Sequence, residues 1–154
     1  MDRLGICTRA GIGQDSNRRR KEGQRMERPQ LPGNKAEKLI TFIYYKDLQK
    51  GIDFYEKTLG FPMEIDQGWC KIYRISEAGY VGVVDETRGM HKSHPVKPVQ
   101  ICLRVPDVDA FYRYCREIGV DELSEMFESQ ELKIKAFVFN DPEGYQIEIQ
   151  QSIP

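Results

Sequence analysis

Polar side chains alternate with apolar ones in two segments near the end of the chain, and their types could do chemistry. One segment carries Gln100, Cys102 and Arg104 between apolar residues, and a later one carries Glu148 with glutamines two positions away on each side. In a β-strand, side chains two residues apart lie on the same face. A carboxylate on such a face could act as a general base, and a guanidinium could bind an oxyanion.

Other reactive residue types form weaker patterns. The two histidines, His91 and His94, lie in a segment with glycine and proline, so we expect an exposed loop pair and no metal site. The four cysteines include no C-x-x-C pair, so neither a zinc knuckle nor a dithiol motif is predicted. Cys102 would need a neighbouring base to become a nucleophile, and no histidine is evident for that role.

Aromatic residues open the body of the chain. Alternation in the first predicted strand places Phe42 and Tyr44 on one face with Ile40, and we expect Val81 and Val83 of a later strand to share that face. These side chains either fill a core or form an aromatic wall for a flat apolar ligand.

The elements that must position these residues occur twice. A strand at residues 38–45 is followed by a helix capped by Asp47, and a strand at residues 99–105 by a helix capped by Asp107. The repeat predicts an α+β fold of two βαβββ modules, at about residues 38–86 and 97–151. Further strands are predicted at residues 69–75, 80–84, 124–128, 133–139 and 145–150.

Length and composition favour one ordinary domain. The chain has 154 residues, of which 40% are hydrophobic, and a net charge of −1. Residues 1–35 are basic and follow neither a helical nor a strand period, so we expect a disordered tail before a single domain at residues 36–154. The tail lacks interleaved aromatics, so nucleic acid is not an expected partner, and no apolar run is long enough for a membrane. We therefore expect a cytoplasmic protein.

Two motifs carry a family resemblance. Residues 54–61 read FYEKTLGF shortly after Asp47 and Leu48, and residues 139–148 read FNDPEGYQIE. With these motifs, residues 38–151 resemble the vicinal oxygen chelate superfamily, which includes glyoxalases, bleomycin-resistance proteins and extradiol dioxygenases. The resemblance implies that the two modules form a cup from curved mixed sheets, with a small organic molecule and often a divalent metal inside.

The resemblance also implies where a metal would be bound. In this chain those positions hold Ile40 and Gln100 in the first strands, and Val83 and Glu148 in the closing strands. Two of these side chains offer donors, whereas tight transition-metal sites use three or four ligands. We therefore predict a protein that binds a small organic molecule without a metal cofactor. The alternative is a divalent-metal-dependent lyase, isomerase or dioxygenase with an incomplete ligand set.

The predicted site combines the aromatic face of the first module with the polar face of the second. Glu148 is the candidate catalytic residue, and Gln100 with Glu148 are weak candidates for metal ligands. The resemblance implies a homodimer, in which the modules pair within one chain or across the dimer. A cup that serves only as a dimer interface is a third hypothesis. The candidate ligand-binding residues are Phe42, Tyr44, Gln100, Cys102, Arg104 and Glu148.

Overall fold

The structure of the protein is a computed structural model that describes residues 37–154. The basic tail predicted at residues 1–35 lies outside these residues, as does Cys7. Within the described part, none of the helices has the length and apolarity that a membrane span requires.

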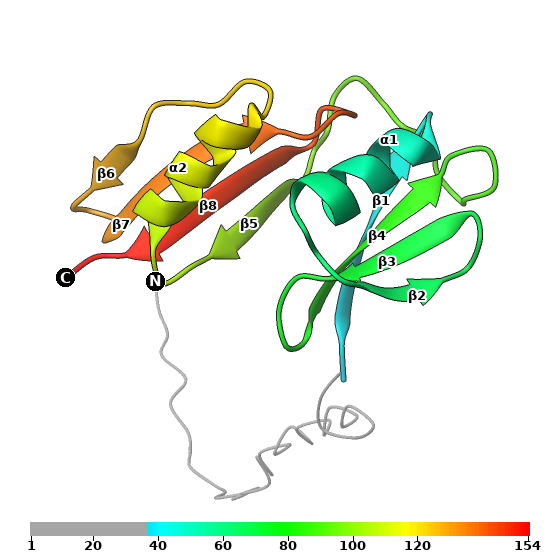
Figure 1. Cartoon of the computed structure of the whole chain (residues 1–154), viewed down its shortest axis with the longest axis horizontal. Helices are drawn as coiled ribbons and strands as arrows, with labels where there is room; N and C mark the ends of the chain where they lie inside the picture. Colours follow the sequence, from blue (N-terminus) through cyan, green and yellow to red (C-terminus); the bar gives the residue numbers. More distant parts are fainter. Residues whose placement is uncertain (1–36) are drawn as a thin grey trace, which may run out of the picture. The chain divides into compact units, whose positions relative to one another are not determined.

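The first module is a strand, a helix and three further strands, as the repeat predicted (Figure 1). Its sheet has the order β1-β4-β3-β2, so β1 lies at one edge, parallel to β4. The elements are β1 (Leu39–Tyr45), α1 (Leu48–Ile52), the π-helical segment η1 (Asp53–Thr58), β2 (Met63–Asp66), β3 (Cys70–Arg74) and β4 (Gly79–Asp85).

Local signals explain the bounds of the first helix. The carboxylate of Asp47 accepts a hydrogen bond of 3.0 Å from the Gln49 amide, which satisfies a free donor of the first turn. The second half of the helix is a π-helical turn, in which the Leu59 amide donates to the Phe54 carbonyl over 2.8 Å. The chain then turns at Gly60, whose φ of 72° suits glycine.

The second module repeats the first. The Asp107 carboxylate caps its helix by accepting from the Ala110 amide over 2.9 Å, and the left-handed Gly119 ends it. The sheet order is β5-β8-β7-β6, which again places the first strand at an edge. The elements are β5 (Gln100–Arg104), α2 (Val108–Ile118), β6 (Phe127–Ser129), β7 (Ile134–Asn140) and β8 (Gln146–Ser152).

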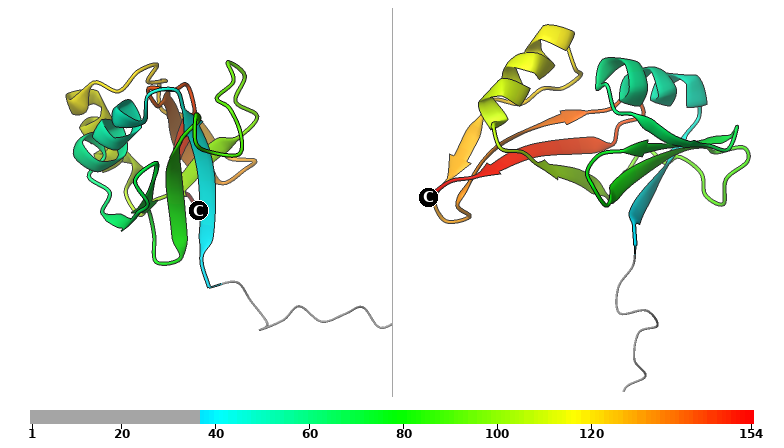
Figure 2. Two further views of the ribbon diagram at one scale, coloured as in Figure 1. Left: turned by 90° about the vertical axis from the view of Figure 1, so that its right-hand side faces the viewer. Right: turned by 60° about the horizontal axis from the view of Figure 1, so that its bottom comes forward.

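One hydrophobic core joins the two modules. The helices cover the same side of both sheets (Figure 2), and the side chains between helices and sheets are buried together. We call the opposite side of the two sheets the cup face. The strand registers place on it Ile40, Phe42, Tyr44, Tyr80, Gly82 and Val84 of the first module, and Gln100, Cys102, Arg104, Gln146, Glu148 and Gln150 of the second.

Alternation was correct for most strands and wrong for one. Ile147 and Ile149 lie on the helix side, as expected, but so do Val81 and Val83, which were expected on the face of Phe42. The register pairs Phe42 with Gly82, so Val81 and Val83 lie on the opposite face, and a shift of one residue in a strand register reverses the face of every side chain.

The sequence pattern also missed one strand. Strand β2 has four residues, all exposed, so it has no alternation of buried and exposed positions from which it could be recognised.

Candidate functional site

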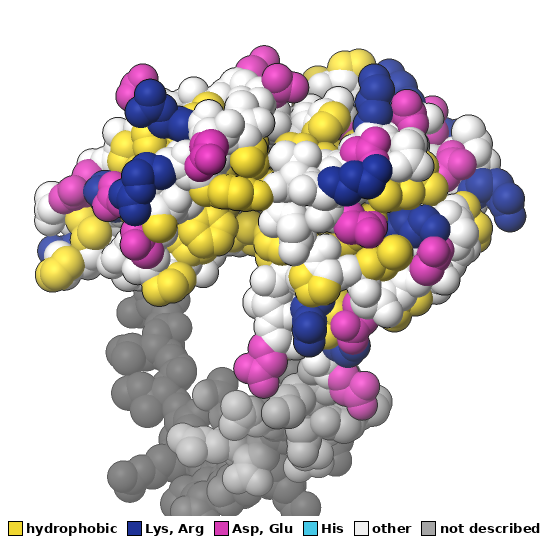
Figure 3. Space-filling view, in the orientation of Figure 1, with side chains coloured by type: hydrophobic (Ala, Val, Ile, Leu, Met, Phe, Trp, Pro, Cys, Tyr) yellow, Lys and Arg dark blue, Asp and Glu magenta, His cyan; other side chains and the backbone are white. Residues whose placement is uncertain are grey.

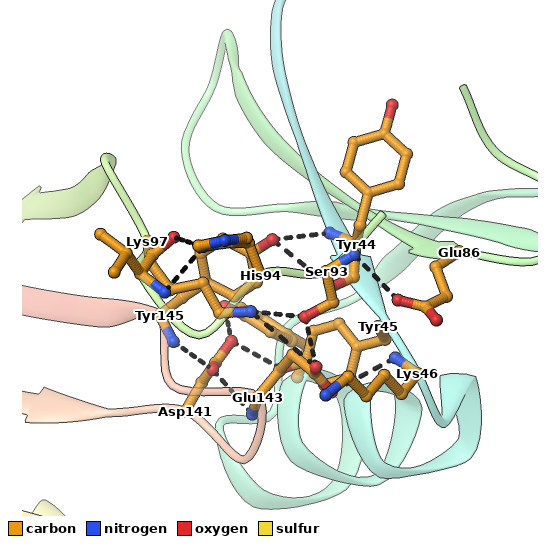
Figure 4. Close-up of polar contacts among 12 residues, drawn as sticks. Tyr44, Tyr45, Lys46, Glu86, Ser93, His94, Lys97, Asp141, Glu143 and Tyr145 are labelled. Atoms are coloured by element: carbon orange, nitrogen blue, oxygen red, sulfur yellow. Dashed lines mark hydrogen bonds and ion pairs between the residues drawn. The ribbon is translucent and has the colours of Figure 1, made fainter. Parts of the chain in front are cut away.

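Strands β1 and β5 are each at one edge of their sheet, so neither has a strand partner on its outer side. These two free edges face each other (Figure 1), and we call the strip between them the seam. At one end of the seam, a buried carboxylate connects the modules (Figure 4). The hydroxyls of Tyr45 and Tyr55 donate to Asp141 Oδ2 over 2.5 and 3.1 Å, and the amides of Glu143 and Tyr145 donate to Oδ1 over 3.0 and 2.8 Å. We call Tyr45, Tyr55, Asp141 and Tyr145 the latch.

The latch carries a strong electrostatic perturbation. Asp141 is only 2% exposed, and this burial raises the pKa of its carboxyl above the ordinary value, while the donated hydrogen bonds oppose the shift. Burial likewise raises the pKa of Tyr45 and of Tyr55, and the nearby carboxylate adds to the shift. Both phenols therefore stay protonated as donors, which suits a structural connection between modules.

The hydroxyl of Tyr145 reaches the free edge of β1. It accepts a hydrogen bond of 3.0 Å from the Tyr44 amide and donates to the Tyr44 carbonyl over 3.4 Å. Lys97 Nζ lies 4.5 Å from the centre of the Tyr145 ring, a cation–π contact. At Tyr44, the otherwise unpaired edge of β1 thus bonds to a side chain of the second module.

The connector between the modules is tied to the same end of the seam. Ser93 donates through its hydroxyl to Glu143 and through its amide to Glu86, the latter over 2.8 Å (Figure 4). Lys97 Nζ lies 2.5 Å from the Ser93 hydroxyl and 3.8 Å from Glu143 Oε1. The Ser93 hydroxyl, Glu143 and Lys97 are thus satisfied by one another, and we interpret the group as structural.

The cup face of the second module carries the polar residues singled out in the sequence. Gln100 Nε2 donates to Gln146 over 2.7 Å, and Gln150 Nε2 donates to Cys102 Sγ over 2.7 Å. The thiol of Cys102 lies 3.9 Å from Glu148 Oε1.

Arg104 and Glu148 lie on the same face but form no ion pair with each other. Arg104 donates to Gln150 over 3.4 Å instead, and no carboxylate of residues 37–154 forms an ion pair with it. Its guanidinium charge is thus available to an anionic group.

The cup face of the first module is apolar. Phe42 is 47% exposed, and its ring lies over Gly82, where a Cβ atom would come within 2.5 Å of it. Tyr44 contacts His91 edge to face, with 5.3 Å between ring centres, so one of the two loop histidines packs on this aromatic surface. The structure therefore brings Phe42 and Tyr44 to one face of the first sheet and the polar candidates to the same face of the second.

At the other end of the seam lies a pocket of about 380 Å³. Hydrophobic side chains gather around the hollow between the modules in Figure 3. Sequence reasoning missed this pocket, because it is formed by residues of both modules that follow the core pattern of their own strands. Its lining includes Leu39, Thr41, Ser76, Leu103, Val105 and Phe111, together with Arg104 and Cys102.

The donors present do not fit a metal centre. The register aligns Phe42 with Gly82 and Cys102 with Glu148, so the position equivalent to Glu148 is Gly82 and not Val83. Gly82 has no side chain, Ile40 has no donor, and Gln100 already binds Gln146. In residues 37–154, no group of three His, Cys, Asp or Glu side chains could hold a metal ion. A transition metal would find too few ligands here.

The chain was compared with known families and known proteins. Residues 39–149 match the family model described as Glyoxalase/Bleomycin resistance protein/Dioxygenase superfamily. No curated protein matches the chain.

Several solved structures share the fold. TnmS3, an antibiotic binding protein from Streptomyces sp. CB03234, is 23% identical, with a TM-score of 0.62 over 76% of this chain and 96% of that one. A superfamily member from Sphaerobacter thermophilus DSM 20745 is 23% identical, with a TM-score of 0.64 over 76% and 98%. A lactoylglutathione lyase from Agrobacterium tumefaciens is 15% identical, with a TM-score of 0.60 over 73% and 91%. At these identities the likeness shows a shared fold.

Proposed function

The chain belongs to the glyoxalase/bleomycin resistance protein/dioxygenase superfamily, and we propose that it binds a small organic molecule on its cup face without a catalytic metal. The observation that carries the proposal is the contrast between the two halves of that face. The first module presents exposed aromatic surface, and the second presents a row of amide, thiol, carboxylate and guanidinium groups. Ligand sites combine apolar walls with a few polar anchors in this way.

We expect the residues of the cup face to contact different parts of the ligand. Phe42 and Tyr44 offer ring surface to a flat apolar part of the ligand. Arg104, which has no acidic partner in the described residues, offers a guanidinium to an oxyanion. Glu148 is half-buried, and the thiol of Cys102 is a weak donor to its carboxylate. The Glu148 carboxylate is therefore available to accept from a ligand N–H or O–H. An antibiotic-binding protein among the structures of the same fold agrees with this use.

A metal-dependent lyase, isomerase or dioxygenase is the alternative function, and the donor set argues against it. Glu148 and Gln100 are the two donors at the four positions where relatives bind a metal. Two oxygen donors do not hold a catalytic transition metal, so we derive no reaction through one.

We further propose that the protein is a cytoplasmic homodimer. Phe42 on the cup face and Phe127 on strand β6 expose large apolar surface, and edge strands favour pairing with a second copy. Cys70, Cys102 and Cys115 form no disulfide with one another, as is usual in a reducing compartment.

A ligand screen with a matched pair of variants tests the proposed site. The full chain is screened by thermal shift against polar aromatic compounds, antibiotics included, and the dissociation constant of each hit is measured by calorimetry. Glu148→Gln should weaken binding by about 1–3 kcal/mol, the range for losing a charged hydrogen bond, and leave the melting temperature unchanged. Glu131→Gln, an exposed loop control, should change neither quantity. A Glu148→Gln variant that lowers the melting temperature but binds every hit normally would make Glu148 a structural residue.

A further inference from the structure

The two ends of the seam are related by the internal repeat, although they look different. Asp47 and Asp107 cap equivalent helices, so Tyr44 and Tyr45 correspond to Arg104 and Val105. In the closing strands, Ile40 pairs with Tyr80 as Gln100 pairs with Gln146, so Tyr145, which precedes Gln146, corresponds to Gly79. The latch and the pocket therefore occupy equivalent places in the fold.

The pocket exists because the large latch residues have small counterparts. Tyr45 is fully buried, whereas its counterpart Val105 is half-buried and lines the pocket. Tyr145 fills its end of the seam with a ring, whereas its counterpart Gly79 has no side chain and lines the pocket as well. Phe111 recovers part of the space lost with the Tyr45 ring, since it lies where Gly51 lies in the first helix.

A pair of main-chain groups faces the pocket. The Val105 amide donates to the Gln150 carbonyl over 2.8 Å, so the amide and carbonyl of Val105 point toward β8. Bonding alternates along a strand, so the amide and carbonyl of Arg104 point the other way, toward the seam. At the latch end, the equivalent amide and carbonyl of Tyr44 are both bound by the Tyr145 hydroxyl. The Arg104 groups have the same direction, but the counterpart of Tyr145 at this end is Gly79, which has no side chain.

We propose that this pocket is a second ligand site and that it takes a phenolic compound. The aromatic ring of the ligand lies in the pocket among Leu39, Leu103 and Phe111. This position is equivalent to the one that the Tyr145 ring fills at the latch end. Its hydroxyl accepts from the Arg104 amide and donates to the Arg104 carbonyl, as the Tyr145 hydroxyl does with Tyr44. The volume of about 380 Å³ lies within the range of small-molecule sites and is larger than one ring needs.

The chemistry of the lining supports a neutral or anionic ligand. Arg104 is the one charged residue of the pocket, and the other polar side chains are the hydroxyls of Thr41, Ser76 and Tyr80 and the thiol of Cys102. A cationic amine would meet no carboxylate there. The site borders the proposed cup site, since Arg104 and Cys102 line both, but it is built on apolar side chains of the helix side and does not use Phe42 or Glu148.

The test compares 2-naphthol with 2-methoxynaphthalene, which has a similar ring system and no hydroxyl proton. Binding to the full chain is measured by equilibrium dialysis, and the site is mapped by amide chemical shifts of ¹⁵N-labelled protein. 2-Naphthol should bind about tenfold more tightly than the ether, corresponding to about 1.4 kcal/mol. The largest shifts should fall on the amides of Arg104, Val105 and Gly79.

Variants of one pocket residue complete the test. Thr41→Phe places a ring in the pocket and should weaken 2-naphthol binding at least tenfold, whereas Thr41→Val keeps the volume and should retain it. If Thr41→Phe lowers the melting temperature strongly, Val105→Phe fills the same space from the other module. Equal affinity for the two compounds, shifts centred on Phe42 and Glu148, or no saturable binding would each overturn the proposal. The second of these outcomes would leave the cup site intact.

Discussion

Removing the Tyr45 hydroxyl should destabilise the protein more than the loss of an ordinary surface hydrogen bond. The hydroxyl donates to Asp141 Oδ2 over 2.5 Å, and both residues are buried. A hydrogen bond to a charged acceptor contributes about 1.5–3 kcal/mol to stability. In Tyr45→Phe the carboxylate keeps its bonds from Tyr55 and from two amides, so it is not left without partners. We therefore expect a loss of about 1.5–3 kcal/mol in the free energy of unfolding, or roughly 5–12 °C in the melting temperature.

Asp141→Ala should cost more, about 3–6 kcal/mol, because it leaves two buried tyrosine hydroxyls without their acceptor. Urea unfolding followed by circular dichroism measures these free energies. Since Tyr45 and Tyr55 donate to the same oxygen, the double variant with phenylalanine at both positions should deviate from additivity by about 0.5–3 kcal/mol. Tyr114→Phe is the control, because that hydroxyl donates to the Thr58 carbonyl at an exposed site. If Tyr45→Phe costs no more than Tyr114→Phe, the latch does not hold the modules together.

Three further expectations concern pH, the tail and assembly. Burial raises the pKa of Asp141 above 3.8 in the folded chain. Between the unfolded and folded pKa values, the folded chain therefore holds a proton that the unfolded chain releases. Binding of this proton stabilises the fold at low pH, and the stabilisation is lost as the pH rises through the folded pKa. Asp141→Asn should therefore fall further behind the wild type in urea unfolding as the pH is lowered from neutral toward 3.8, and a difference independent of pH would contradict the raised pKa. Deleting residues 1–35 should change the melting temperature by less than about 2 °C, and loss of cooperative unfolding would show that the segment belongs to the fold. Light scattering should give about twice the chain mass of 17.9 kDa, whereas a monomer mass at micromolar concentration would refute the dimer.

The repeat of strand and capped helix predicted the two modules correctly, because Asp47 and Asp107 satisfy local amides and such signals are readable in sequence. Alternation also placed Gln100, Glu148 and their neighbours on one face, since strand geometry fixes the side on which alternate residues lie. It failed for Val83 because alternation within one strand does not fix the register with the next strand, and a shift of one residue reverses the face of every side chain.

The latch and the pocket depend on contacts that no local pattern encodes. Tyr45 and Asp141 are 96 positions apart in sequence, and each alone resembles an ordinary strand or turn residue. The pocket is harder still, because it arises where Val105 and Gly79 are smaller than their counterparts in the repeat. Recognising it requires the exact register of both sheets, which alternation within single strands does not fix.

Amide chemical-shift mapping with and without a metal tests whether the cup face binds a small organic molecule in the absence of a metal. The hit of highest affinity from the ligand screen is titrated into the ¹⁵N-labelled full chain, first with EDTA and then with added nickel or zinc. We expect saturable shifts at Phe42, Cys102 and Glu148 with the same dissociation constant in both conditions. Binding that disappears with EDTA and returns with the metal, with shifts centred on Gln100 and Glu148, would contradict it.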